Sequence, residues 1–339
     1  MGWKQYMREQ ERRESRGRAE NEVAEYEAYL TALVSLHKDC GPTWNWAALR
    51  MAPPPVQPAA PQGAPPVQPG ATHEREAAAL AALARFAPGF FDSVLGKAKQ
   101  QRAALEEAVT HARADDAAAN QHNLGAYHRA HAAYAASLRQ HDDYRREHAL
   151  WTVRQPLAEG VLKRSPDAYR RAIEHAQSFR WLSHFQTRVA TFAVSEDAEG
   201  VAVDLNLEDR DIVPREELKL TAGGKVSTKN MAAGRYWLLF QDHVCSCTLR
   251  AARELFAVLP VQRAIVNVRM DRLNPATGYD ESVTIVAALF VRHVLHGLNM
   301  AQLDPSDSLR NFPHRMKFKK TAGFDAVEPI TFDEQWVTT

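Results

Sequence analysis

The sequence has little cysteine, little excess charge and no long apolar run, and each shortage argues against a class of protein. Its 339 residues include 3 cysteines, Cys40, Cys245 and Cys247, too few for a disulfide framework, so we expect a reducing, cytoplasmic environment. Its 42 Lys and Arg balance 41 Asp and Glu, whereas a dedicated nucleic-acid-binding protein usually has a clear basic excess. No uncharged apolar run approaches the roughly 18 residues of a membrane span, so we expect no membrane association.

Motifs with a specific chemical mechanism are missing as well. The sequence has no Walker loop, dinucleotide-binding glycine fingerprint, nucleophile elbow, zinc knuckle or kinase signature. It is 45% hydrophobic and 24% charged, the ordinary mix of a globular protein. Its length suits about two domains of roughly 150 residues each. The abundance of Ala, Arg and His fits a bacterial gene of high GC content.

A proline-rich stretch divides the chain. Of its 18 prolines, 8 fall in residues 53–69, and residues 52–72 carry no charge. Because proline fixes φ and removes a backbone donor, we expect residues 52–72 to form an extended linker. A ligand for a proline-binding module would have a similar composition.

Helical patterns flank this linker. Residues 1–51 are expected to form a charged N-terminal region, with a helix over 5–37. The second half of that helix carries a stripe at alternating spacings of three and four: Val23, Tyr26, Leu30, Leu33 and His37. After the stripe, Gly41-Pro42 ends the helix. Trp44 and Trp46 either pack back on this helix, which we expect, or are exposed for a partner.

Residues 73–160 are rich in Ala, the strongest helix former. We expect a break at 87–89 and then a long helix from about 93 to 151. Six residues along that helix keep a strict heptad spacing: Leu124, Tyr127, His131, Tyr134, Leu138 and His141. So thin a stripe needs a partner helix, which is either the 20–37 segment or a second subunit.

Residues 165–339 mix helical and strand periodicity. Ser165-Pro166-Asp167 is a typical helix start, and an apolar stripe over 236–258 marks a core helix that ends before Pro260. Shorter helices are expected over 291–302 and after Asp304-Pro305. Strands are expected over 189–194, 201–207, 217–221, 264–268 and 283–290. This order predicts an α+β domain in which helices pack on a mostly antiparallel sheet.

The order of elements over residues 165–270 resembles the restriction-endonuclease-like core. That family places an Asp on its second strand and a Glu/Asp-x-Lys on its third, which hold a divalent metal and orient the attacking water. Here Asp204 lies on the second expected strand, and Glu217 and Lys219 lie on the third. The resemblance implies a metal-dependent nuclease. Asp204 also suits the solvated face of an amphipathic strand, and we expect no other cofactor or metal.

A basic run near the C-terminal end is the other candidate site. Within residues 308–323, which contain no acid, lie Arg310, Arg315, Lys317, Lys319 and Lys320. Interleaved with Phe312 and Phe318, they suit phosphate binding and base stacking. Alternating Lys is equally typical of a protected edge strand.

Cys245 and Cys247 lie two apart on the expected core helix, about 200° around its axis. They cannot easily share a metal or a disulfide, so we expect Cys247 to be a small core residue. The leading hypothesis is a cytoplasmic interaction or assembly protein whose helical region self-associates or binds a protein partner and positions a partner-binding α+β domain. The alternative is a metal-dependent nuclease or nucleic-acid-binding protein.

Overall fold

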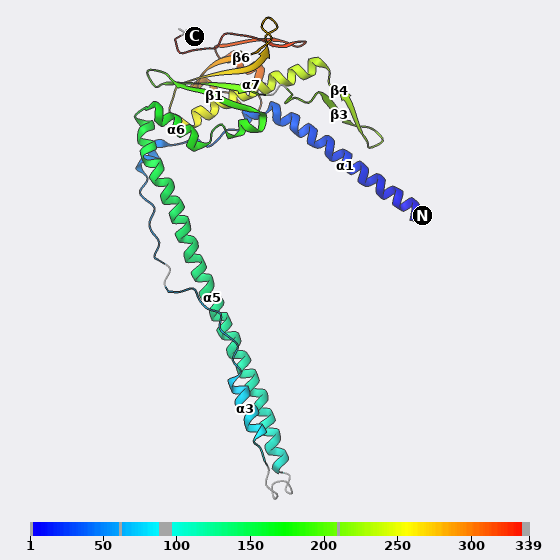
Figure 1. The fold of residues 1–339 in the computed structure, drawn as a ribbon, viewed down its shortest axis with the longest axis vertical. Helices are drawn as coiled ribbons and strands as arrows, with labels where there is room; N and C mark the ends of the chain where they lie inside the picture. The colour runs from blue at the N-terminus through cyan, green and yellow to red at the C-terminus, as the bar shows by residue number, and fades with distance from the viewer. Residues whose placement is uncertain (1–2, 61–62, 88–96, 209–210, 334–339) are drawn as a thin grey trace. The chain divides into compact units, whose positions relative to one another are not determined.

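The computed structural model describes residues 3–60, 63–87, 97–208 and 211–333, with side chains from residue 16 onward. The chain divides into two compact units (Figure 1). Unit 1 comprises residues 1–52 and 154–339, and unit 2 comprises residues 53–153. Unit 2 is therefore an insertion between the N-terminal segment and the rest of unit 1.

Unit 1 is built on a 6-stranded sheet with the order β1-β2-β5-β6-β7-β8. The strands are β1 (Thr187–Val194), β2 (Gly200–Leu207), β5 (Arg263–Leu273), β6 (Asp280–Val291), β7 (His314–Lys319) and β8 (Gly323–Asp325). Neighbouring strands are antiparallel except β2 and β5, which are parallel. A parallel pair needs a crossover connection, which helix α7 (Ala233–Val258) supplies. The expected α+β class with a mostly antiparallel sheet is confirmed.

Shorter elements complete the two units. Unit 1 also contains α1 (Trp3–Val34), η1 (Leu36–Lys38), α2 (Trp46–Met51), α6 (Pro166–Ala176), η2 (Arg180–Phe185), the hairpin β3 (Glu216–Leu220) and β4 (Val226–Asn230), α8 (Arg292–His296), α9 (Pro305–Ser308) and η3 (Leu309–Asn311). Unit 2 contains α3 (Glu74–Ala84) and most of α5 (Lys97–Leu162), which lie side by side (Figure 1). Helix α5 ends in unit 1.

The core of unit 1 lies between the sheet and α7 (Figure 1). Strand residues alternate between two faces, and every second residue of β2 from Val201 to Leu207 is buried in this core. The apolar stripe over 236–258 and the expected strands supply this core, because these residues on them are buried: Val203, Leu205, Val244, Cys247, Ala251, Leu255, Val266, Val268 and Ile285. Trp237, on the same apolar stripe, is half-buried against this cluster.

The N-terminal segment packs on α7 and belongs to the same core. Leu30, Leu33 and Leu36 are buried, and the His243 ring Nδ1 on α7 lies 3.0 Å from the Leu33 carbonyl oxygen, which accepts its hydrogen bond. Trp46 is buried and its Nε1 donates to the Val258 carbonyl, so Trp46 packs into the core as expected, but its hydrogen bond is to α7 and not to the N-terminal helix.

Two element boundaries differ from the sequence expectation. Helix α5 continues past Trp151, through Pro156, to Leu162, because Leu157, Ala158 and Val161 are buried and outweigh the backbone donor that proline removes. The helix expected over 291–302 ends at His296, where the N–H of Gly297 caps the last carbonyls. Residues 314–319 of the basic run form strand β7, which lies between β6 and β8 and is therefore not the edge strand that the sequence offered as an alternative. The expected break at 87–89 and the helix start near 93 fall mostly outside the described residues.

Leu255→Ala tests the assignment of the inner face of α7. Leu255 is fully buried, whereas Leu238 on the same helix is exposed. We expect Leu255→Ala to lower the free energy of unfolding by about 2–5 kcal/mol, because the lost methyl groups leave a cavity. The control, Leu238→Ala, should change it by less than about 1 kcal/mol. Equal losses in urea titrations would contradict this orientation of α7.

Two neighbouring groups on α7 predict opposite pH dependences. Burial lowers the pKa of His243 from 6.5 to about 4, so its contribution to stability is present above pH 6.5 and is lost as the pH falls to about 4. Burial, reinforced by Asp304, raises the pKa of Asp242 from 3.8 to about 6. Its contribution is present below pH 3.8 and is lost as the pH rises through about 6.

Single variants should separate these contributions. With Asp242→Asn, the free energy of unfolding should fall more steeply on acidification than in the wild type, because only His243 remains. With His243→Gln, it should fall less steeply or rise. Urea denaturation at a series of pH values between these pKa values measures both slopes, and identical slopes in the two variants would contradict the assignment.

Candidate functional site

A polar row crosses the face of the sheet that lies opposite α7, here called the outer face. Asp204 and Asn206 on β2 lie beside Asn267 and Arg269 on β5. The Asn267 Nδ2 donates to Asp204 Oδ1 at 3.0 Å, and Arg269 Nη1 lies 3.9 Å from Asp204 Oδ2. The sequence-predicted carboxylate therefore has an amide and a guanidinium as neighbours.

Residues 326–333, the C-terminal strap, run across this outer face. The strap and the sheet line an open cavity of about 650 Å³, whose walls include Asp204, Asn267 and Arg269. Both backbone groups of Ile330 bond to Asn267, whose Oδ1 accepts from the Ile330 N–H at 3.0 Å and whose Nδ2 donates to the Ile330 carbonyl at 3.2 Å. The Ile330 side chain is buried against Ile265 and Leu289.

The chemistry of this cavity is that of an anchor. The side-chain amide of Asn267 is fully used in hydrogen bonds to the strap and to Asp204. The strap is also held by the Val327 N–H, which donates to the Thr284 carbonyl at 2.9 Å. Among the described residues, no group of three His, Cys, Asp or Glu side chains is placed to hold a metal ion. Asn206 Oδ1 and Arg269 Nε are buried, and neither has a hydrogen-bond partner among the residues that the structure describes.

The other two residues of the nuclease hypothesis lie elsewhere. Glu217 and Lys219 are on β3, which pairs with β4 in a separate 2-stranded sheet. The Glu217 carboxylate pairs with Arg235 at 2.6 Å and with Lys219 at 3.5 Å. Neither residue lines the cavity that contains Asp204. The structure thus does not bring Asp204 together with Glu217 and Lys219, because β3 does not join the main sheet.

The basic run is largely engaged within the chain. Arg315 Nη1 donates to the Pro329 carbonyl of the strap at 2.7 Å, Arg310 pairs with Asp307 at 3.0 Å, and Lys319 pairs with Asp325 at 2.9 Å. That hydrogen bond from Lys319 lowers the pKa of Asp325.

The two remaining lysines of the run differ in their surroundings. Lys317 faces Asp325 across the β7–β8 pair, and Lys320 lies exposed in the turn after β7. Strand β7 therefore combines basic side chains with acidic or carbonyl partners, which weakens the case for a continuous phosphate-binding surface.

The thiols of α7 lie in the core. Cys245 and Cys247 are both fully buried, and burial raises the pKa of each thiol. A buried, protonated thiol is a poor nucleophile and a poor metal ligand. The expectation that Cys247 is a core residue is confirmed.

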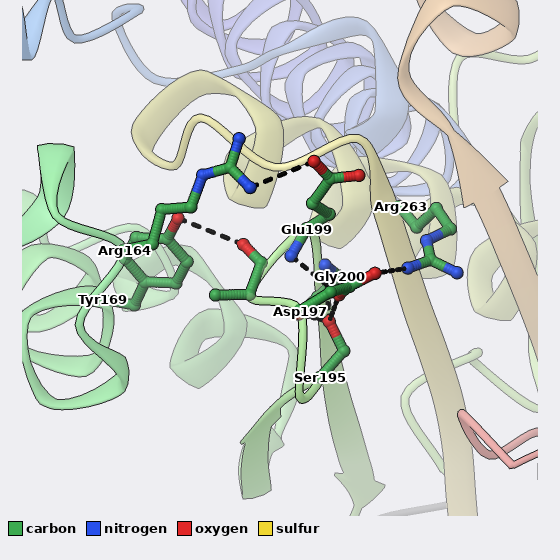
Figure 2. Close-up of polar contacts among 8 residues, drawn as sticks. Arg164, Tyr169, Ser195, Asp197, Glu199, Gly200 and Arg263 are labelled. Atoms are coloured by element: carbon green, nitrogen blue, oxygen red, sulfur yellow. Dashed lines mark hydrogen bonds and ion pairs between the residues drawn. The ribbon is translucent and has the colours of Figure 1, made fainter.

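A polar network at the β1–β2 turn was not predicted from the sequence (Figure 2). Asp197 accepts hydrogen bonds from Ser195 Oγ at 2.5 Å and from Arg263 at 2.5 Å, and the bond from Ser195 lowers the pKa of Asp197. Arg164 pairs with Glu199 at 3.0 Å. Ala198 has a left-handed φ of 52°, which these contacts hold in place. The groups satisfy one another, so the network serves the turn.

The heptad stripe that the sequence predicted lies on α5. Within unit 2, α3 covers a different part of α5, where the Glu76 N–H donates to Asp116 at 2.9 Å and Arg113 pairs with Glu76 at 2.6 Å. Further along α5, Leu124 is 37% exposed and Leu138 is 43% exposed. The tyrosines between them are half-buried.

Proline-rich residues lie beside α5 at two points. Asn120 bonds to the backbone of Thr72, and the His141 ring Nε2 lies 2.7 Å from the Ala59 carbonyl. Residues 53–72 contain neither helix nor strand where they are described. In unit 2 this segment therefore accompanies the helix and leaves both leucines of the stripe exposed.

Comparisons add no family to this picture. No protein-family model matches the chain, and neither do curated proteins or solved structures. Among the described residues, every helix is too short or too polar to cross a membrane. Function must therefore be argued from the surfaces of the molecule itself.

Asn267→Ala tests the anchoring of the strap. It removes the partner of both Ile330 backbone groups and of Asp204, so we expect a loss of about 1–3 kcal/mol in the free energy of unfolding and faster cleavage after Glu328 by a Glu-specific protease. Asn206→Ala is the matched control, because the Oδ1 of Asn206 accepts no hydrogen bond from the described residues. Equal protection of Glu328 in both variants would argue against the anchor.

Proposed function

We propose that the protein is an assembly protein that self-associates through helix α5. One observation carries this proposal: the two leucines of the stripe, Leu124 and Leu138, stay exposed although the stripe has the spacing of a helix-pairing seam. Exposed Leu side chains beside half-buried Tyr on an Ala-rich helix form an apolar surface, which marks a site for association with a partner. A cytoplasmic location fits the low cysteine content.

The 20–37 segment, which the sequence offered as an intrachain partner for the stripe, already packs within unit 1. Val23, Leu30 and Leu33 of the 20–37 segment are buried in unit 1, where α1 packs on α7. Covering the α5 stripe with this segment would expose those three side chains. A second copy of the chain is the alternative that the sequence left open, and it requires no such loss.

The order of residues on the stripe favours a second copy. From residue 124 to residue 138 the stripe reads Leu, Tyr, His, Tyr, Leu, which is the same in both directions. In an antiparallel pair, Leu124 of one copy therefore lies near Leu138 of the other. Residues 117–138 carry a single charged side chain, Arg129, so two helices can approach without burying unpaired charges. The many Ala side chains allow that approach to be close.

In this assembly, self-association through α5 would position the C-terminal domain, which is part of unit 1. Unit 1 has its own core and contains all of the sheet, and two copies would present two such domains. This arrangement needs neither metal nor nucleotide.

Leu138→Glu tests self-association. We expect the wild-type chain to sediment as a dimer and Leu138→Glu to raise the dissociation constant about 100-fold, because each dimer then buries two carboxylates at ~1–3 kcal/mol each. The matched control is Leu150→Glu: Leu150 is 42% exposed on the same helix and lies twelve residues after Leu138, on the side away from the heptad stripe.

Analytical ultracentrifugation over a concentration series reads out both variants. A dimer that survives Leu138→Glu but is lost with Leu150→Glu would place the contact on another face of α5. A wild-type chain that stays monomeric at all concentrations would overturn the proposal.

A further inference from the structure

A groove in unit 1 follows the open edge of the sheet. Strand β1 is an edge strand, paired with β2 on one side. Six consecutive β1 residues, 187–192, line a groove of about 650 Å³. Because strand side chains alternate between faces, a groove lined by consecutive residues runs along the backbone edge, where N–H and C=O groups are free to pair.

The opposite wall of the groove is formed by α6 and η2 with the turn between them. Ile173 and Phe179 from this wall face Val189 and Phe192 of β1. All four side chains are buried or half-buried against the core of unit 1, so the floor of the groove is apolar and fixed. Such a floor receives the side chains on one face of an extended segment.

The charged groups of the groove are mostly cationic. Arg170, Arg180 and Arg188 line it, against one acid, Glu174. Arg188 pairs with Glu208 at 2.5 Å, whereas Arg170 forms no ion pair or side-chain hydrogen bond with the described residues. Ser178 also lines the groove; it is 4% exposed, and its Oγ has no hydrogen-bond partner in the described part of the chain. A buried hydroxyl without a partner is costly unless a ligand completes it.

We propose that this groove binds an extended acidic segment of a partner protein, which adds to the sheet as a strand beside β1. The backbone of the segment pairs with the β1 edge, alternate apolar side chains enter the apolar floor, and carboxylates on the rim face Arg170 and Arg180. Backbone pairing supplies affinity, and the pockets and charges supply selectivity. This inference goes beyond self-association through α5, since the groove lies wholly within unit 1.

A second copy of the chain is the less suitable occupant. Strand β1, with the sequence TRVATFAV, carries Arg188 and no acid. Pairing two copies edge to edge would therefore place two basic strands side by side with no acid on either, which gives no charge complementarity. A partner that supplies acids complements the same edge.

The binding test uses the full chain and a fluorescent, end-capped peptide that alternates valine and glutamate over about eight residues, the length of a strand. Two control peptides carry either glutamine in place of glutamate or N-methyl groups on alternate residues. We expect the acidic peptide to bind, the glutamine peptide to bind at least about tenfold more weakly, and the methylated peptide not to bind. Fluorescence anisotropy at low and high salt measures all three.

Protein variants place the peptide in the groove. Arg170→Glu should weaken binding at least about tenfold, whereas Arg171→Glu, which makes the same charge change on α6 outside the groove, should weaken it less than about twofold. Ala190→Pro should abolish binding without unfolding the chain. Ala190 is exposed and falls at the shift in register, where it has no partner on β2, so proline there blocks only the outer edge. Circular dichroism checks the fold of each variant.

Several results would overturn this proposal. Among them are no binding of the acidic peptide, equal binding of the methylated peptide, and equal effects of Arg170→Glu and Arg171→Glu. A dimer in sedimentation that is lost with Ala190→Pro would mean that a second copy occupies the groove. Loss of the dimer through Leu138→Glu alone, with peptide binding intact, separates this inference from the function of α5.

Discussion

The burial of helix α7 on two sides is the constraint on which the rest of unit 1 depends. Of its 26 residues, 16 are buried, more than the single inner stripe of a surface helix supplies. The apolar side faces the sheet. The opposite side carries His243, Ser246 and Glu254, which bond to the Leu33 carbonyl, to the N–H of His37 and to the N–H of Gly41. This polar stripe determines where the N-terminal segment docks, because each buried group needs that partner.

The sequence predicts these two sides of α7 unequally. Its apolar stripe from Trp237 to Val258 was readable because apolar spacing near 3.6 residues directly indicates a buried helix face. The polar stripe was not, since His and Ser at those positions would look the same on a solvated face. For the same reason, the N-terminal helix looked like a separate helical region, although it belongs to the C-terminal domain. Its true partner lies about 200 residues away, and local periodicity carries no such information.

The candidate sites show a similar limit. Asp204, Glu217 and Lys219 have the residue types and alternation of a nuclease motif, but β3 pairs with β4 instead of joining the main sheet. The β1-edge groove had no signal in the sequence, because an edge strand and an inner strand have the same alternation. The heptad stripe was predictable at the level of single residues. Its partner could not be predicted, because pairing within one chain and pairing with a second copy require the same heptad spacing.

The position of unit 2 in the chain has a consequence for synthesis on the ribosome. Leu33 and His243 are 210 residues apart, and residues 53–153 of unit 2 account for nearly half of that separation. At about 5–20 residues per second, α7 emerges roughly 10–40 s after α1. For most of that interval the apolar side of α1 has no native partner, because β3 and β4, which it also contacts, emerge only shortly before α7, whereas unit 2 can already fold. The docking of α1 is therefore a late, long-range step, and nascent chains must keep this helix from aggregating until α7 arrives.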